Sequence, residues 1–427
     1  MQKTLFISLL SVFCCLLSAQ TPRSEIGKNI RCSASSYLAY PGPTQHQLTP
    51  PPTGMKPFFI SHYGRYGSRY HTRPSTYDTP YHLLAAADSA GKLTPLGRDV
   101  LHRLDLIRQE ANLHWGELTE LGAEQHRQIV SRMYERFPEV FTDDADIEAR
   151  STTVGRCILS MEHALLQLLR LNPRLTIHHN ATVRDRNYLD YQDRQLIALR
   201  NDSAVTAVYR RFNEKHEHSR RLLHLLFNDR DYARQLDATQ LCSSLFTIAS
   251  NIQSSNIRKR VTLYDLYTDE ELYQHWLCEN ASCYVSYGNT PISGNLQPYS
   301  QRFLLRQIIE DADRHIRESR TGVTLRFGSE TALLPLCCLL DVNGCGLSTN
   351  RLESLGRKRW VDYRLIPMAA NIQLVFYRKE TGGDVLFKVL LNENEATLPL
   401  RTLNPPYYHW DDFKTYYLKK LEAYEKR

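Results

Sequence analysis

Residues 58–72 read Phe-Phe-Ile-Ser-His-Tyr-Gly-Arg-Tyr-Gly-Ser-Arg-Tyr-His-Thr. The stretch opens with a short apolar run, which is typical of a buried strand. Gly64 and Gly67 then permit a tight turn whose backbone can approach a ligand closely. Arg65 and Arg69 stand four residues apart at the end of this strand, where two guanidinium groups can bind one phosphate through charge-assisted hydrogen bonds. The pattern predicts an anion-binding turn, although this stretch alone is more often a solvent-exposed arginine-rich loop.

A second strand-like segment, residues 322–327, ends at Gly328 and is followed by Ser329 and Glu330. A Ser-Glu pair in this place is typical of the N-cap and first turn of a helix. In a binding site, the serine hydroxyl could donate one hydrogen bond to a bound oxygen. The glutamic acid could protonate a leaving group as a general acid. Taken alone, the pair favours the capping interpretation.

A third segment, residues 150–161, places Arg156 just ahead of apolar residues at helical spacing, and Pro173 bounds the predicted helix. Arg156 would then lie at a helix N-terminus, where free backbone N–H groups also favour anions. Upstream, residues 116–122 read Gly-Glu-Leu-Thr-Glu-Leu-Gly and open another helix.

In this order, the segments resemble the histidine phosphatases, in their acid phosphatase and phytase branch. Residues 65–69 are similar to the Arg-His-Gly-x-Arg signature, and Tyr66 stands where the family has the histidine that becomes phosphorylated. Arg156 corresponds to the third phosphate-binding arginine. Ser329 and Glu330 stand where the family has His-Asp, or His-Ala-Glu in its inositol polyphosphate branch. Further stretches, at residues 263–264, 287–289, 367–371 and 405–408, resemble bacterial multiple inositol polyphosphate phosphatases, so the likeness covers nearly the whole chain after residue 20.

The resemblance implies a site in which Tyr66 replaces the nucleophile and Glu330 is the candidate proton donor. The implied phosphate-binding residues are Arg65, Arg69, Arg156 and Ser329. A phenol has an ordinary pKa of ~10, so it offers little nucleophilic phenolate at neutral pH. We therefore expect a protein that binds phosphate monoesters, inositol polyphosphates such as phytate among them, with impaired catalysis. Two alternatives stay open: an active phosphomonoesterase with rearranged chemistry, and a non-catalytic surface interaction protein that uses only the fold.

The resemblance and the periodicity predict a three-layer α/β/α core with a mostly parallel sheet and an inserted helical cap. Residues 21–184 and 296–427 would form the core, with strands ending near Arg65 and spanning 145–151, 174–179, 322–327, 371–377 and 385–391. Residues 185–295 have a helical pattern and would form the cap. The site would lie at the carboxyl ends of the strands, below the cap.

Residues 1–20 have a lysine, an apolar run and a small-residue end, which indicates a secretory signal peptide. We expect export to the periplasm, the cell surface or the medium, and no other segment is long and apolar enough to span a membrane. Cys14 and Cys15 lack the preceding small residue expected of a lipidated cysteine. Two of the ten cysteines lie in this segment, and the other eight could form disulfides in an exported protein.

Cys278 and Cys283 are the best local candidates for a disulfide, and Cys337, Cys338 and Cys345 could pair with one another or with Cys32. The cysteine and histidine spacing predicts no metal site, and no motif indicates a cofactor or nucleic acid. The net charge of +7 suits a polyanionic small molecule.

Overall fold

The computed structural model describes residues 21–216 and 220–427, so the predicted signal peptide at residues 1–20 lies outside the described residues. Its centre is a single sheet whose strands follow the order β3-β2-β4-β1-β5-β6-β7, with β8 paired to β6. The strands are β1 (Met55–Arg65), β2 (Asp146–Ser151), β3 (Ile177–Asn180), β4 (Gly322–Gly328), β5 (Asn371–Lys379), β6 (Leu386–Leu391), β7 (Asn394–Ala396) and β8 (Tyr408–His409). The strands expected from the sequence are all present.

The sheet is mixed rather than mostly parallel. β3, β2, β4 and β1 pair in parallel, whereas β5 runs antiparallel to both β1 and β6, and β6 runs antiparallel to β7 and β8. Hairpins explain the antiparallel pairs β5–β6 and β6–β7, because two strands joined by a short loop must run in opposite directions. The antiparallel pair of β1 and β5 has no such connection, since these strands are far apart in the sequence. The predicted α/β class is confirmed, with this correction to the pairing.

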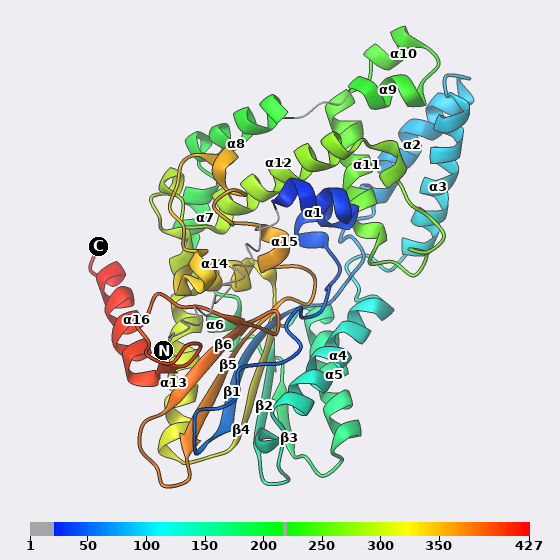
Figure 1. Cartoon of the computed structure of the whole chain (residues 1–427). Helices are drawn as coiled ribbons and strands as arrows, with labels where there is room; N and C mark the ends of the chain where they lie inside the picture. Colours follow the sequence, from blue (N-terminus) through cyan, green and yellow to red (C-terminus); the bar gives the residue numbers. More distant parts are fainter. Residues whose placement is uncertain (1–20, 217–219) are drawn as a thin grey trace, which may run out of the picture.

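Helices cover both faces of the sheet (Figure 1). α4 (Glu120–Arg136) and α5 (Gly155–Leu171) pack on one face against strand residues such as Val323, Leu325 and Val375. α13 (Arg302–Arg317) and α16 (Trp410–Glu425) lie on the other face, where Phe59 and Phe376 are buried. Val375 and Phe376 are neighbours in β5 and enter different cores, as the two-residue period of a strand requires.

Helices also lie beyond the carboxyl ends of β1 and β4 (Figure 1). Residues 185–295 supply α6 (Arg186–Leu189), α7 (Arg194–Arg200), α8 (Ser203–His216), α9 (Arg220–Leu226), α10 (Arg230–Arg234), α11 (Ala238–Ile252) and α12 (Asp269–Tyr287), and no strand is found among their described residues. α2 (Ser75–Ser89) packs against α11, and α3 (Pro95–Ala111) packs against α9. Two helices from the segment before residue 184 thus join this helical layer.

The cysteines of the described residues form no disulfide. The proposed Cys278–Cys283 bridge is wrong for this structure, because both residues lie on α12. Five helical steps rotate the second side chain by about 140° around the axis, so the two point in different directions. Within residues 21–216 and 220–427, no helix is long and apolar enough to cross a membrane.

Candidate functional site

The end of β1 is joined to the start of α4 through backbone contacts that leave no room for side chains. Tyr70 donates its backbone N–H to Glu117 at 3.0 Å, and Thr119 donates to Ser68 at 2.9 Å. A Cβ on Gly67 would lie 2.5 Å from the Gly122 carbonyl oxygen, and one on Gly122 would lie 2.2 Å from the Ser68 oxygen. The two glycines let the turn after β1 and the N-terminus of α4 touch, which explains both glycine positions.

Three arginines from two segments surround Tyr66. Arg65 ends β1, and Arg156 lies in the first turn of α5. The guanidinium carbons of Arg156, Arg65 and Arg69 lie 4.5, 5.1 and 5.6 Å from the centre of the Tyr66 ring. The structure therefore brings together the three arginines that the sequence singled out, and we call this group the arginine cradle.

Two arginines of the cradle are held firmly by the chain. Arg65 is 1% exposed, and its Nη1 donates to the carbonyl oxygens of Ser36 and Ile366, each at 2.6 Å. Arg69 donates from Nη1 to its neighbour Tyr70 and from Nη2 to the Tyr37 hydroxyl at 3.4 Å. Such contacts fix the orientation of a guanidinium before any ligand arrives, which reduces the entropy lost on binding.

Glu330 forms an ion pair with the cradle, since its Oε2 lies 3.2 Å from Arg65 Nε. Burial raises the pKa of this carboxyl, but the charges of Arg65 and Arg69 and a hydrogen bond with Tyr66 outweigh burial and lower the pKa to about 2. Glu330 is therefore ionised at neutral pH. A role as proton donor requires a bound anion that raises this pKa by repulsion.

Ser329 is the N-cap of α14 (Glu330–Leu340), as the capping interpretation predicted. Its Oγ accepts from the Thr331 backbone N–H at 3.3 Å and donates to Glu330 Oε2 at 3.0 Å. These bonds occupy the hydroxyl within its own helix end. Ser329 adds no positive charge to the cradle, unlike a histidine in the same place.

The Tyr66 ring is 1% exposed and packs with Cys157 and Met368, beside the partly buried Tyr37. Its position in the cradle is fixed at the backbone by a bond to Gly328 at the end of β4. A neutral imidazole could attack phosphorus from this position, whereas a phenol must first lose a proton. Three positive charges at this point could bind an anion, and a phenol is a weaker nucleophile than an imidazole.

A turn at Ala369 holds the backbone on the other side of Tyr66. Ala369 donates to the Tyr66 carbonyl at 3.0 Å, and Arg65 donates to the Ala370 carbonyl at 2.8 Å. Ala369 has φ 56°, a left-handed conformation that is strained for a residue with a side chain. The surrounding contacts must compensate for this strain.

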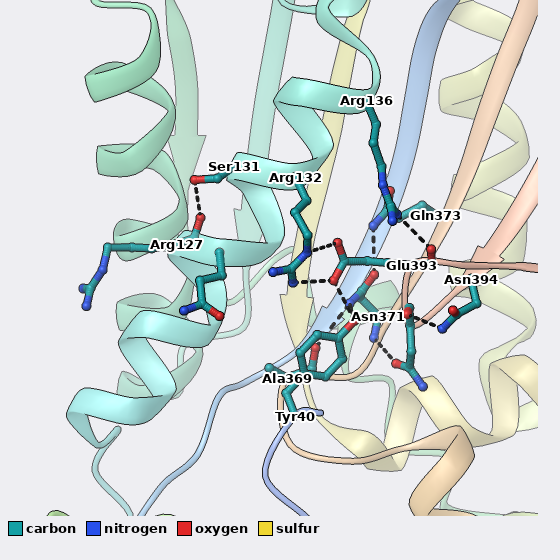
Figure 2. Close-up of polar contacts among 12 residues, drawn as sticks. Tyr40, Arg127, Ser131, Arg132, Arg136, Ala369, Asn371, Gln373, Glu393 and Asn394 are labelled. Atoms are coloured by element: carbon teal, nitrogen blue, oxygen red, sulfur yellow. Dashed lines mark hydrogen bonds and ion pairs between the residues drawn. The ribbon is translucent and has the colours of Figure 1, made fainter. Parts of the chain in front are cut away.

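Figure 2 shows the polar network that supports this turn. Glu393 is 1% exposed and accepts two bonds from Arg132, at 2.8 and 2.6 Å, and one from the Tyr40 hydroxyl at 2.8 Å. Tyr40 in turn accepts from the Asn371 side chain at 3.2 Å, two residues after Ala369. The network ties α4, the segment before β1 and the turn between β6 and β7 to the chain that holds Tyr66.

Sequence reasoning missed this network, and it also missed Tyr37 and Met368 beside Tyr66. Residues 367–371 indicate only a likeness to a family pattern and no contact with Tyr66. Nothing in the sequence signals that Arg132 and Glu393, which are 261 residues apart, meet as a buried pair. Across residues 21–216 and 220–427, no group of three potential ligands could hold a metal ion.

Comparisons with known proteins identify the family and support the fold. The model of the histidine phosphatase superfamily (branch 2) matches residues 75–392. The crystal structure of the Bifidobacterium longum multiple inositol polyphosphate phosphatase in complex with inositol hexasulfate superimposes with a TM-score of 0.74 at 16% identity, over 90% of this chain and 96% of that chain. The crystal structure of a phytase from D. castellii gives a TM-score of 0.65 at 13% identity, over 92% of this chain and 85% of that chain. A comparison with curated proteins gives no match.

Proposed function

This chain belongs to the histidine phosphatase superfamily, branch 2, and from that membership we propose that it binds phosphate monoesters in the arginine cradle without efficient hydrolysis. The observation that carries the proposal is the set of three guanidinium groups around Tyr66, each within 5.6 Å of its ring centre. A phosphate dianion matches such a cluster in charge and in hydrogen-bond acceptors. The B. longum relative has been crystallised with inositol hexasulfate and with phosphate, so inositol polyphosphates belong to the ligands to be tested.

Impaired catalysis follows from the two substituted positions. Tyr66 has no imidazole lone pair, and losing a covalent nucleophile commonly costs several orders of magnitude in rate. Ser329 adds no cation to stabilise the transferring phosphoryl group. A cradle that keeps its arginines but lacks these two histidines should still bind phosphate, while its rate of phosphate ester hydrolysis should fall strongly. With residues 1–20 as a signal peptide, binding would take place outside the cytoplasm.

One observation favours an active enzyme as the second candidate. The Tyr66 phenol shares a hydrogen bond with Glu330 and lies among three guanidinium groups, which would stabilise the negative charge of a phosphoryl group while the phenol oxygen attacks phosphorus and gives its proton to water. Tyr66→Phe separates the two candidates. The variant keeps the ring and the arginines, so it should leave phosphate binding intact and abolish any turnover that depends on the phenol.

The proposal is tested by calorimetric titration of the purified protein with inorganic phosphate. Arg156→Ala should weaken binding by about 2 kcal/mol, the scale of a charged hydrogen bond, which is ~30-fold. Arg174→Ala is the matched control, because Arg174 is 75% exposed and pairs with Asp143 away from the cradle. No measurable binding by the unmutated protein, or equal affinity for Arg156→Ala, would favour the interaction protein that uses only the fold.

A further inference from the structure

A buried carboxylate, Asp362, lies behind the arginine cradle. Asp362 begins α15 (Asp362–Leu365), a short helix that packs against α12 and against the 3₁₀ helix Ile30–Tyr37. The residue is 0% exposed. The pKa of its carboxyl is about 6, above the ordinary 3.8, because burial outweighs the hydrogen bonds that it accepts from uncharged donors. A carboxylate in such a place is costly unless donors converge on it.

The donors around Asp362 come from three separate segments. Its Oδ2 accepts from the Ser35 hydroxyl in the 3₁₀ helix. Its Oδ1 accepts from Trp276 Nε1 of α12 at 3.1 Å and from the Tyr363 backbone N–H of α15 at 2.7 Å. The Asp362 backbone N–H donates to Asn280 Oδ1, also on α12, at 2.9 Å. One carboxylate thus ties the 3₁₀ helix, α12 and α15 together.

Two of these segments carry the carbonyl groups that hold Arg65. Arg65 Nη1 donates to the carbonyl oxygens of Ser36 and Ile366, each at 2.6 Å. Ser36 directly follows Ser35, whose hydroxyl is bound to Asp362. Ile366 donates its backbone N–H to the Asp362 carbonyl at 2.7 Å. Both supports of the Arg65 guanidinium therefore depend on segments that meet at Asp362.

The backbone at Ser35 needs such a restraint. Ser35 has φ 56° and ψ −133°, a conformation that is unfavourable for a residue with a side chain. Strain of this kind persists only where the surrounding contacts hold it. The bond between the Ser35 hydroxyl and Asp362 supplies part of that restraint. Without it, the chain would relax at Ser35 and turn the Ser36 carbonyl away from Arg65.

We propose that Asp362 is a positioning residue of the phosphate site. It holds Ser35 and α15 so that the carbonyls of Ser36 and Ile366 keep the Arg65 guanidinium oriented before a ligand arrives. A guanidinium that is already fixed loses less entropy when it binds an anion. The inference rests on the proposed function and adds a buried residue, outside the cradle itself, on which the affinity for phosphate depends.

The test is calorimetric titration of the full protein and its variants with inorganic phosphate, with thermal unfolding measured in parallel. Asp362→Ala should weaken phosphate binding about tenfold, the scale of ordering one mobile side chain. Asp362→Asn should restore most of this affinity, because its amide oxygen still accepts from Trp276 and its amide N–H can donate to the Ser35 oxygen. A role confined to stability would lower the melting temperature of Asp362→Ala and leave the affinity of the folded protein unchanged.

Ser35→Ala provides a second variant if Asp362→Ala fails to fold. It removes only the hydroxyl that reaches Asp362, and it should weaken phosphate binding by about fivefold. Ser33→Ala is the matched control, since Ser33 is equally buried in the same 3₁₀ helix and its hydroxyl donates to the Ile30 carbonyl at 2.6 Å. The affinity of Ser33→Ala for phosphate should equal that of the unmutated protein.

Three results would overturn the inference while the proposed function stands. In the first, Arg156→Ala weakens phosphate binding, but folded Asp362→Ala or Ser35→Ala binds phosphate as tightly as the unmutated protein. In the second, Ser33→Ala weakens binding as much as Ser35→Ala, which would show a general disturbance of the 3₁₀ helix. In the third, Asp362→Asn binds no better than Asp362→Ala, so the tie to Ser35 is not what matters. If the unmutated protein itself binds no phosphate, the proposed function fails together with this inference.

Discussion

Glu330→Gln perturbs the cradle at a carboxylate that would compete with a bound anion for Arg65. In the folded protein this carboxyl has a pKa of about 2, below its ordinary 4.5, with an ionised side chain that is 22% exposed. A difference of this size corresponds to about 3 kcal/mol of stability at neutral pH. We therefore expect Glu330→Gln to lower the free energy of unfolding by up to about 3 kcal/mol in buffers without phosphate.

The pH dependence has a definite sign. Because the pKa is lower in the folded than in the unfolded protein, the contribution of Glu330 is present above pH 4.5 and is lost as the pH falls toward 2. The free energy of unfolding of the unmutated protein should fall by this amount between pH 4.5 and pH 2. The Glu330→Gln variant should not show this part of the decrease. Urea unfolding at a series of pH values measures both.

Phosphate binding should change in the opposite direction. At ~6 Å and an effective dielectric constant of about 20, a carboxylate repels each phosphate charge by roughly 3 kcal/mol, and solvent at a partly exposed group reduces this to about 1–2 kcal/mol. Calorimetry should find phosphate bound about tenfold more tightly by Glu330→Gln. Glu380→Gln is the matched control, since Glu380 pairs with Lys56 on the surface. If Glu330→Gln behaves like Glu380→Gln in both stability and affinity, the reasoning is refuted.

Three further predictions concern the cradle and its support. Tyr66→His should restore weak phosphatase activity with a detectable phosphohistidine. Adding Ser329→His should raise the rate, although loss of the N-cap should cost about 1 kcal/mol of stability. A folded double mutant without turnover would contradict this prediction. Arg69→Ala should weaken phosphate binding by about 2 kcal/mol in calorimetry, whereas unchanged affinity would exclude Arg69 from the site. Glu393→Gln should destabilise the fold by about 3 kcal/mol in urea unfolding, because it leaves Arg132 without its buried partner; a stability within 1 kcal/mol of the unmutated protein would show that the pair does not support the fold.

The positions of site residues could be predicted where a charged side chain lies at the end of a strand or helix with a clear hydrophobic pattern. Arg65 and Arg156 could be placed because each follows a regular element with a recognisable boundary, a strand end in one case and a helix start in the other. The loop between β5 and β6, residues 379–384, contains two adjacent glycines and is typical of a hairpin. The pairing of the whole sheet could not be predicted in this way, since strand order depends on contacts between segments hundreds of residues apart.

Electrostatics could not be predicted from residue types. The position of Glu330 in the sequence makes it a candidate proton donor, but its ionisation depends on Arg65 and Arg69, which lie close by in space. Sequence patterns place residues at the ends of elements, whereas the charge and hydrogen-bond state of each group depends on the assembled fold.

The central claim is that the arginine cradle recognises phosphate while Tyr66 prevents efficient turnover. The most direct test is the rate of phosphate release from phytate and from an aryl phosphate by the purified protein over a wide pH range. The account predicts a rate at least ~10³-fold below that of a histidine-bearing relative, with phosphate binding retained in the same preparation. Turnover near ~10 s⁻¹, a typical enzyme value, would contradict it.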